Sequence, residues 1–177
     1  MKKIFIYFFL LILSVSIQAE GHLKIKGIEI DGHINTFIGK MQNIGLTYNR
    51  NVEKHITEME GSFAGYDGCI FYIYNTKITK TVYRVMVIFP LQSNCEEANE
   101  EFNALEILYT SKYGDDISEW TFAYKTECRS YGMLYELNEG DIYLKLLPSK
   151  NNAVEYADKI NMSKNIQEDK TNALDDI

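Results

Sequence analysis

The residue types that could do chemistry in this chain are histidine, cysteine, clustered carboxylates and tyrosine. The histidines are His22, His33 and His55, and none lies four residues from another histidine or from a cysteine. Zinc sites of the common spacings need such neighbours, so we predict no metal site and interpret the histidines as surface imidazoles. No cofactor is predicted either.

The carboxylates gather in two groups, at Glu96, Glu97, Glu100 and Glu101 and at Asp115, Asp116 and Glu119. The first group falls in the opening turns of a predicted helix, where negative charge complements the helix dipole. The second lacks the glycine and the spacing of a calcium-binding loop. We assign no catalytic residue. An alternative interpretation is a small exported hydrolase whose dispersed acid/base site uses some of these carboxylates.

The three cysteines, Cys69, Cys95 and Cys128, match no metal or redox spacing. A predicted helix from Cys95 to Tyr113 rises about 28 Å. A predicted strand from Trp120 to Cys128 then returns over about the same length. We therefore predict a disulfide between Cys95 and Cys128 that leaves Cys69 as a free thiol. Three buried free cysteines are the alternative.

The chain contains 13 tyrosines, whose rings suit both sheets and binding faces. Apolar residues occur on both sides of the predicted strands 69–75 and 82–89, whereas a strand with one solvated face would alternate apolar and polar residues. Some tyrosines should then lie on a sheet face that no helix covers. The alternatives are that they fill the core or that a homodimer covers them. The candidate binding residues are Tyr72, Tyr74, Tyr83, Tyr124, Tyr135 and Tyr143.

The pattern along the chain predicts two helices and many short strands. Residues 22–30 alternate as a strand does. A helix over 34–44 follows Asp31, and a second over 95–113 follows a capping box formed by Ser93 and Glu96. The glycine-rich run 61–68 lacks the Lys-Ser/Thr of a phosphate-binding loop, so we interpret it as a hairpin with its turn at Asp67-Gly68. The other predicted strands are 46–49, 56–64, 69–74, 82–89, 120–126, 131–137, 141–147 and 153–158.

These elements predict an α+β fold in which two helices pack on one face of a large, mainly antiparallel sheet. Each half of the chain runs from a helix into several strands, which indicates a pseudo-repeat. This order of elements resembles the architecture of the β-lactamase inhibitor protein. That resemblance implies a concave, tyrosine-rich sheet.

Residues 1–19 have the pattern of a signal peptide. Lys2 and Lys3 precede an apolar run from Ile4 to Val15, and Ala19 offers a small residue at the cleavage site. The apolar run is too short to span a bilayer, so we expect no stable membrane insertion after cleavage. We predict export to the periplasm or the medium, a single α+β domain over 20–160, and a polar tail over 161–177 that is a frayed helix or disordered.

The net charge of −7 argues against a nucleic-acid partner, because nucleic-acid affinity comes largely from neutralised phosphates. Four segments, HLKIKGIEIDG, GSFAGYDG, TKTVYRV and EYADKIN with a terminal DDI, are similar to the small exported proteins of unknown function common in Bacteroides-like Gram-negative anaerobes. The resemblance implies export and a shared fold, and no catalytic residue. We therefore expect a non-catalytic binding module that recognises a protein or glycan. A structural envelope protein is a further alternative.

Overall fold

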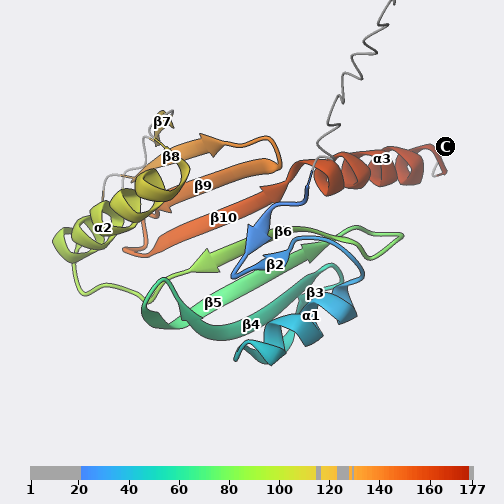
Figure 1. The fold of residues 1–177 in the computed structure, drawn as a ribbon, viewed down its shortest axis with the longest axis horizontal. Helices are drawn as coiled ribbons and strands as arrows, with labels where there is room; N and C mark the ends of the chain where they lie inside the picture. Colours follow the sequence, from blue (N-terminus) through green and yellow to red (C-terminus); the bar gives the residue numbers. More distant parts are fainter. Residues whose placement is uncertain (1–20, 115–116, 123–127, 129, 176–177) are drawn as a thin grey trace, which may run out of the picture.

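A computed structural model describes residues 21–114, 117–122, 128 and 130–175, and Figure 1 shows their fold. The predicted α+β class with a large antiparallel sheet is confirmed, but the described residues form three helices rather than two. The helices are α1 (Ile34–Asn43), α2 (Cys95–Tyr113) and α3 (Lys159–Asp175). The strands are β1 (Lys24–Ile25), β2 (Ile28–Glu29), β3 (Thr47–Glu53), β4 (Ile56–Phe63), β5 (Tyr66–Asn75), β6 (Val82–Ile88), β7 (Ile117–Phe122), β8 (Ser130–Glu136), β9 (Gly140–Leu146) and β10 (Asn152–Asp158).

Eight strands form one antiparallel sheet in the order β3-β4-β5-β6-β10-β9-β8-β7, and β1 and β2 form a separate hairpin. The last strand of the chain, β10, therefore lies in the middle of the sheet. It pairs with β6 on one side, where Val154 lies opposite Val87, and with β9 on the other, where Val154 lies opposite Leu144. The strands before α2 and those after it meet at this junction (Figure 1).

Alternation along the strands gives the sheet two different faces. On the first, which we call the covered face, Phe71, Ile73, Val85 and Val87 are fully buried and belong to one hydrophobic core. Helix α1, helix α2 and the β1–β2 hairpin contribute to that core and lie on the same side of the sheet (Figure 1). On the other, which we call the open face, the alternate residues such as Tyr72 are only partly buried.

The two predicted helices have the expected apolar stripes, but their first residues are capped differently. Helix α1 buries Ile34, Phe37 and Met41, and its N-cap is His33 rather than Asp31. The His33 ring accepts a hydrogen bond from the Asn35 amide at 3.2 Å. Side-chain acceptors at this position satisfy amides that have no partner inside the helix.

Helix α2 begins one residue later than the predicted capping box. Asn94 is its N-cap and accepts from the Glu97 amide at 2.9 Å, while Glu97 accepts in return from the Ser93 amide at 3.2 Å. The pair differs from a capping box in one respect, because Glu97 accepts from the amide of Ser93 and not from that of the N-cap residue itself. The pair is Asn94 with Glu97 and not the predicted Ser93 with Glu96, because asparagine is as good an N-cap residue as serine.

Two turns also differ from the prediction. Residues 22–30 are not one strand, since the chain reverses at Lys26 and Gly27, with φ of 51° and 80°. The second reversal lies at Ala64 and Gly65, with φ of 52° and 89°. Two successive residues with positive φ favour the turn that matches strand twist. Asp67 and Gly68 lie inside β5 instead.

The tail predicted as a frayed helix or disordered is helix α3, which follows β10 directly and extends from the end of the sheet (Figure 1). The Glu168 carboxylate accepts from the amides of Ile78 at 2.6 Å and Thr79 at 3.3 Å, in the loop between β5 and β6. Lys77 of the same loop pairs with Asp169 at 2.7 Å. These contacts are electrostatic, and the weak hydrophobic periodicity of this segment therefore indicated only a frayed helix or disorder. Within the described residues, no helix is both long and apolar enough to cross a membrane.

Candidate functional site

The open face is the first candidate site, because strand register brings its side chains into continuous rows. One row crosses six strands, from Glu58 in β4 through Tyr72, Met86, Glu155 and Tyr143 to Leu134 in β8. Residues directly opposite on one face lie close enough to interact. The row therefore combines two tyrosines and two aliphatic side chains with charged groups.

A charged cluster of Arg84, Glu155 and Lys145 lies at the middle of the open face. Glu155 is only 12% exposed and accepts from Lys145 at 2.5 Å and from Arg84 at 3.4 Å. The Arg84 guanidinium also stacks on the Tyr74 ring, with its carbon 3.9 Å from the ring centroid. This contact combines ring stacking with cation–π attraction. The buried Arg84 Nε has no hydrogen-bond partner among the described residues.

Four of the six predicted binding tyrosines lie on the open face. Tyr72, Tyr74 and Tyr143 follow from the pairing register. Tyr83 joins them because a register shift between β5 and β6 brings its ring to 6.4 Å from that of Tyr74. All four are partly buried. Their rings cross the β5–β6–β10–β9 part of the sheet.

Of the other two predicted tyrosines, one is buried and the other lies outside the described residues. Tyr135 lies on the covered face, where it is 1% exposed and packs 5.9 Å from the ring of Tyr109. Its assignment as a surface anchor is therefore wrong, because its register opposite Ile142 turns it toward α2. Tyr124 lies outside the described residues.

Burial favours the neutral form of three tyrosines of the open face. Burial raises the pKa of Tyr74, Tyr83 and Tyr143, although the Arg84 charge opposes this at the first two. Desolvation disfavours a phenolate. The surface thus offers phenol hydroxyls that can donate hydrogen bonds, beside ion pairs whose charges largely satisfy one another.

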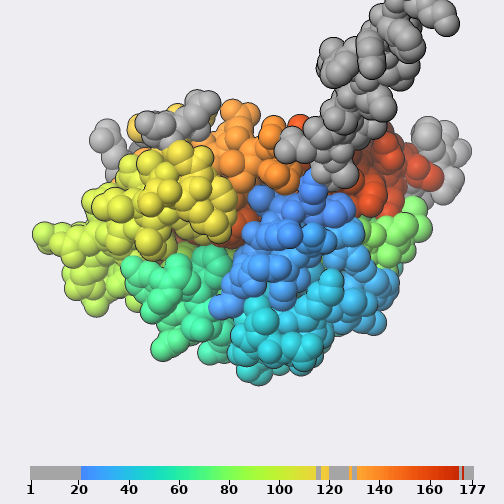
Figure 2. All heavy atoms as spheres, in the orientation of Figure 1, coloured from blue at the N-terminus to red at the C-terminus, as the bar shows by residue number. Residues whose placement is uncertain are grey.

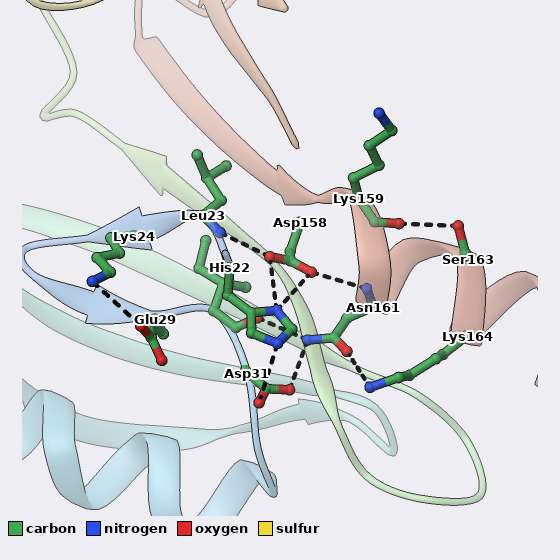
Figure 3. A network of polar contacts seen from close by, with 11 residues as sticks. His22, Leu23, Lys24, Glu29, Asp31, Asp158, Lys159, Asn161, Ser163 and Lys164 are labelled. Atoms are coloured by element: carbon green, nitrogen blue, oxygen red, sulfur yellow. Dashed lines mark hydrogen bonds and ion pairs between the residues drawn. The ribbon is translucent and has the colours of Figure 1, made fainter. Parts of the chain in front are cut away.

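A second polar cluster lies where the N-terminal segment meets the end of β10 (Figure 3). The His22 ring lies between two carboxylates, with Nδ1 3.1 Å from Asp158 and Nε2 3.5 Å from Asp31. Asp158 is fully buried and also accepts from the Leu23 amide at 2.8 Å. Since both ring nitrogens face carboxylates, neither is available to activate a nucleophile.

The same cluster continues into the first turn of α3. Asn161 is fully buried and donates through its side chain to the Ile30 carbonyl and to Asp31, both at 2.9 Å. Burial would raise the pKa of Asp31, but the hydrogen bonds from Asn161 and from the Gly32 amide lower it overall. We call the set His22, Asp31, Asp158 and Asn161 the terminal latch. Its geometry fastens the β1–β2 hairpin to the β10–α3 junction.

Among the described residues, the clustered carboxylates do not converge on a site. Glu97 accepts from the Ser93 amide at the start of α2, while Glu101 faces inward and accepts from Gln92 at 3.0 Å and from Asn152 at 2.7 Å. Burial raises the pKa of Glu101. Asp115 and Asp116 lie outside the described residues. Across the part of the chain that the structure describes, no three His, Cys, Asp or Glu side chains are grouped to hold a metal.

A disulfide joins Cys95 and Cys128, whose Cα atoms are 5.4 Å apart, and this is the pair that the element lengths predicted. Cys69 is the free and buried thiol. Burial raises the pKa of the Cys69 thiol to about 11, which makes it a poor nucleophile at neutral pH. The disulfide ties the first turn of α2 to the segment before β8.

Comparisons with protein-family models, with curated proteins and with solved structures gave no significant match. The resemblances drawn from the sequence therefore stay predictions.

Proposed function

We propose that this protein is an exported, non-catalytic binding module that captures a partner on the open face of its sheet. The observation that carries the proposal is the set of four partly buried tyrosines on a face that neither α1 nor α2 covers. A sheet face that presents aromatic and apolar side chains without a covering helix is typical of binding sites. Tyrosine and arginine are also enriched among the residues that dominate binding energy.

A protein partner fits this surface better than a glycan. Sugars stack on the free face of an aromatic ring, and one face of Tyr74 is already occupied by Arg84. The Lys145 ammonium lies 5.1 Å from the centroid of the Tyr143 ring in the same way. A protein can instead use the phenol hydroxyls as hydrogen-bond donors, and the apolar side chains between them as packing surface.

Export is part of the same proposal. It is supported by the signal-peptide pattern of residues 1–19 and by the disulfide between Cys95 and Cys128, since disulfides persist mainly in oxidising compartments. Intact-mass measurement of the secreted protein should give a chain that starts at Glu20 or within a residue or two. Recovery of the uncleaved chain from membranes would contradict export.

The predicted pseudo-repeat also belongs to the proposal. It is supported by the order of the elements, since α1 precedes the neighbouring strands β3 to β6 and α2 precedes the neighbouring strands β7 to β10. Superposition of the two halves tests it. A match of each helix onto the other, together with its four strands, is the expected result, and helices on unrelated positions would rule the repeat out.

The binding face is tested by capture of a partner from native envelope and culture medium with tagged protein. The pair Tyr72→Ser and Tyr143→Ser should reduce capture by more than about 2 kcal/mol in binding free energy. Tyr48→Ser is the matched control, because Tyr48 is exposed but lies on the edge strand β3. Equal capture by the pair and the control would reject the open face, and a captured glycan in place of a protein would reject the choice of partner.

A further inference from the structure

A pocket of about 340 Å³ opens on the covered side of the molecule, between the β1–β2 hairpin and the C-terminal half of α2. Figure 2 shows the hairpin (blue) and α2 (yellow) side by side on this face. The volume falls in the range of small-molecule sites. The sequence prediction did not include this pocket, because it forms between segments about 85 residues apart that only the fold brings together.

The floor of the pocket is aromatic and uncharged. It is formed by Phe63, Tyr109 and Tyr156, all nearly buried. The hydroxyls of Tyr109 and Tyr156 are hydrogen-bonded to each other. Burial raises the pKa of both tyrosines, so no negative charge develops on the floor at neutral pH. An apolar ligand body can therefore contact the rings without leaving a charged group unsolvated.

The rim of the pocket carries three ammonium groups, those of Lys24, Lys26 and Lys112. Lys26 donates to the Ser62 carbonyl at 2.9 Å, and the Lys112 nitrogen lies 4.8 Å from the centroid of the Tyr113 ring. Neither contact neutralises the positive charge. Long lysine stems line apolar surface while their charged ends remain in water.

The carboxylates near the rim offset this charge only in part. Glu29 pairs with Lys24 at 3.3 Å. An adjoining hollow of about 450 Å³ shares all three lysines and adds His22 and Glu139. At the rim of the pocket itself, three lysines therefore face one carboxylate, Glu29, while Asp31 and Asp158 are taken up by His22 in the adjoining hollow. A local excess of positive charge at the mouth of an apolar pocket is complementary to an anionic head group.

We propose that this pocket binds a small amphiphilic carboxylate, with its apolar body on Phe63, Tyr109 and Tyr156 and its head group among Lys24, Lys26 and Lys112. The site is separate from the open face, because Tyr156 projects on the opposite side of β10 from Glu155. Binding here goes beyond partner capture. It gives the protein a second ligand of different chemistry.

The test is calorimetric titration with decanoate of protein purified from cells that express the full chain. Decanol and decyltrimethylammonium are the neutral and cationic comparisons. Saturable binding of one decanoate, at least tenfold tighter than either comparison, is expected. Binding without a defined stoichiometry, or equal affinity for the three probes, would overturn the proposal.

Two sets of variants separate the head-group contacts from general charge. The double change Lys26→Gln and Lys112→Gln should weaken the binding of decanoate at least tenfold and leave the affinity for decanol unchanged. The double change Lys40→Gln and Lys54→Gln removes the same charge from exposed positions elsewhere and should have little effect. Equal weakening by both doubles would show a non-specific charge effect and sink the proposal.

A third variant tests the apolar part of the site. Leu108 lines the pocket and is 53% exposed, so Leu108→Trp can fill the space without disturbing the core. It should weaken decanoate and decanol alike while leaving partner capture by the open face intact. Unchanged decanoate binding in this variant would place the ligand elsewhere and refute the assignment.

Discussion

The covered and open faces of the sheet are built from alternate residues of the same strands, yet they are stabilised in different ways. On β5, Phe71 and Ile73 are fully buried under the helices and the hairpin, while Tyr72 and Tyr74 between them are only partly buried. An antiparallel sheet with one solvated face normally places polar residues there. Tyrosine suits a face that is partly buried and partly solvated, because its ring buries area and its hydroxyl stays hydrated.

The carboxylates of the two faces also differ in the groups that they contact. On the covered side, Glu101 is buried against the amides of Gln92 and Asn152, which have no charge of their own. On the open face, Glu155 is held between two cations, Arg84 and Lys145. Ion pairs at a partly solvated surface can exchange their partners, whereas a buried carboxyl cannot. The comparison therefore favours a structural role for the covered face, and it is consistent with the recognition that we propose for the open face.

The largest expected effect is the difference in lost stability between a substitution on the covered face and one on the open face. Phe102→Ala on α2 removes a fully buried ring that packs 4.4 Å from Tyr131, and it should cost about 3–5 kcal/mol of unfolding free energy. Tyr72→Ala on the open face should cost about 1 kcal/mol, because the ring is already partly hydrated. Urea denaturation of both variants measures the difference. Similar losses would show that the open face is part of the core.

The disulfide has the next largest effect, and it acts on the covered side alone. Replacement of Cys95 and Cys128 by alanine frees a loop with a sequence separation of 33. The chain-entropy model then gives a loss of about 3–4 kcal/mol. Unfolding in urea measures the loss, and partner capture below the unfolding transition should be unchanged. A loss of capture in the folded variant would contradict the separation of the faces.

Cys69 provides the control for that experiment. Its thiol is buried and its pKa is raised to about 11, so iodoacetamide should not modify the native protein at neutral pH. Unfolding without a reductant should expose one reactive thiol, and reduction should expose two more. Three reactive thiols in the unreduced, unfolded protein would mean that the Cys95–Cys128 bond is absent.

A smaller effect is expected from the charged cluster of the open face. Glu155→Gln leaves Arg84 and Lys145 without the carboxylate between them, and it should cost about 1–2 kcal/mol. Glu60→Gln is the matched control, because Glu60 is exposed and lies on the open face by register. Thermal unfolding compares the two. Equal stability of both variants would show that the cluster contributes only to recognition.

Local sequence patterns predicted most elements of this fold, because each depends on neighbours along the chain. The stripe of Phe37 and Met41 and the length of α2 are examples. The position of β10 between β6 and β9 could not be predicted this way, since it depends on which distant strands pair. Helix α3 was missed as an ordered element because its contacts, such as Glu168 with the amide of Ile78, are polar.

Part of the candidate site was also predicted from local alternation, and the part that depends on distant contacts was not. Alternation in β5 and β6 put apolar residues on both faces, and the structure places Tyr72 and Tyr74 on the open face, while their role in binding stays a prediction. Tyr135 was misplaced because its face depends on its register with β9 and on which side α2 packs. The contact between His22 and Asp158 spans 136 residues, and neither residue has a neighbouring motif that points to the other.

The smallest expected effect concerns the terminal latch, which fastens the hairpin of the covered side and leaves the open face alone. The folded pKa of Asp31 is below its ordinary value of 3.8, since hydrogen bonds from Asn161 and the Gly32 amide outweigh the opposing effect of burial. Its contribution to stability is therefore complete above the unfolded pKa and is lost as the pH falls through the lower folded pKa. The Asp31 side chain is 38% exposed, so solvent screening limits this contribution to about 1 kcal/mol or less.

We expect Asp31→Asn to be slightly less stable than the natural chain near neutral pH and equally stable in strong acid, as measured by urea midpoints across the acid range. Hydrogen exchange should show faster opening of the amides of β1 and β2 in the variant, with no change in β5 or β9. A stability difference that persists in acid would show that the Asp31 carboxylate does not stabilise the terminal latch. Faster exchange in β9 would show that the two faces are coupled.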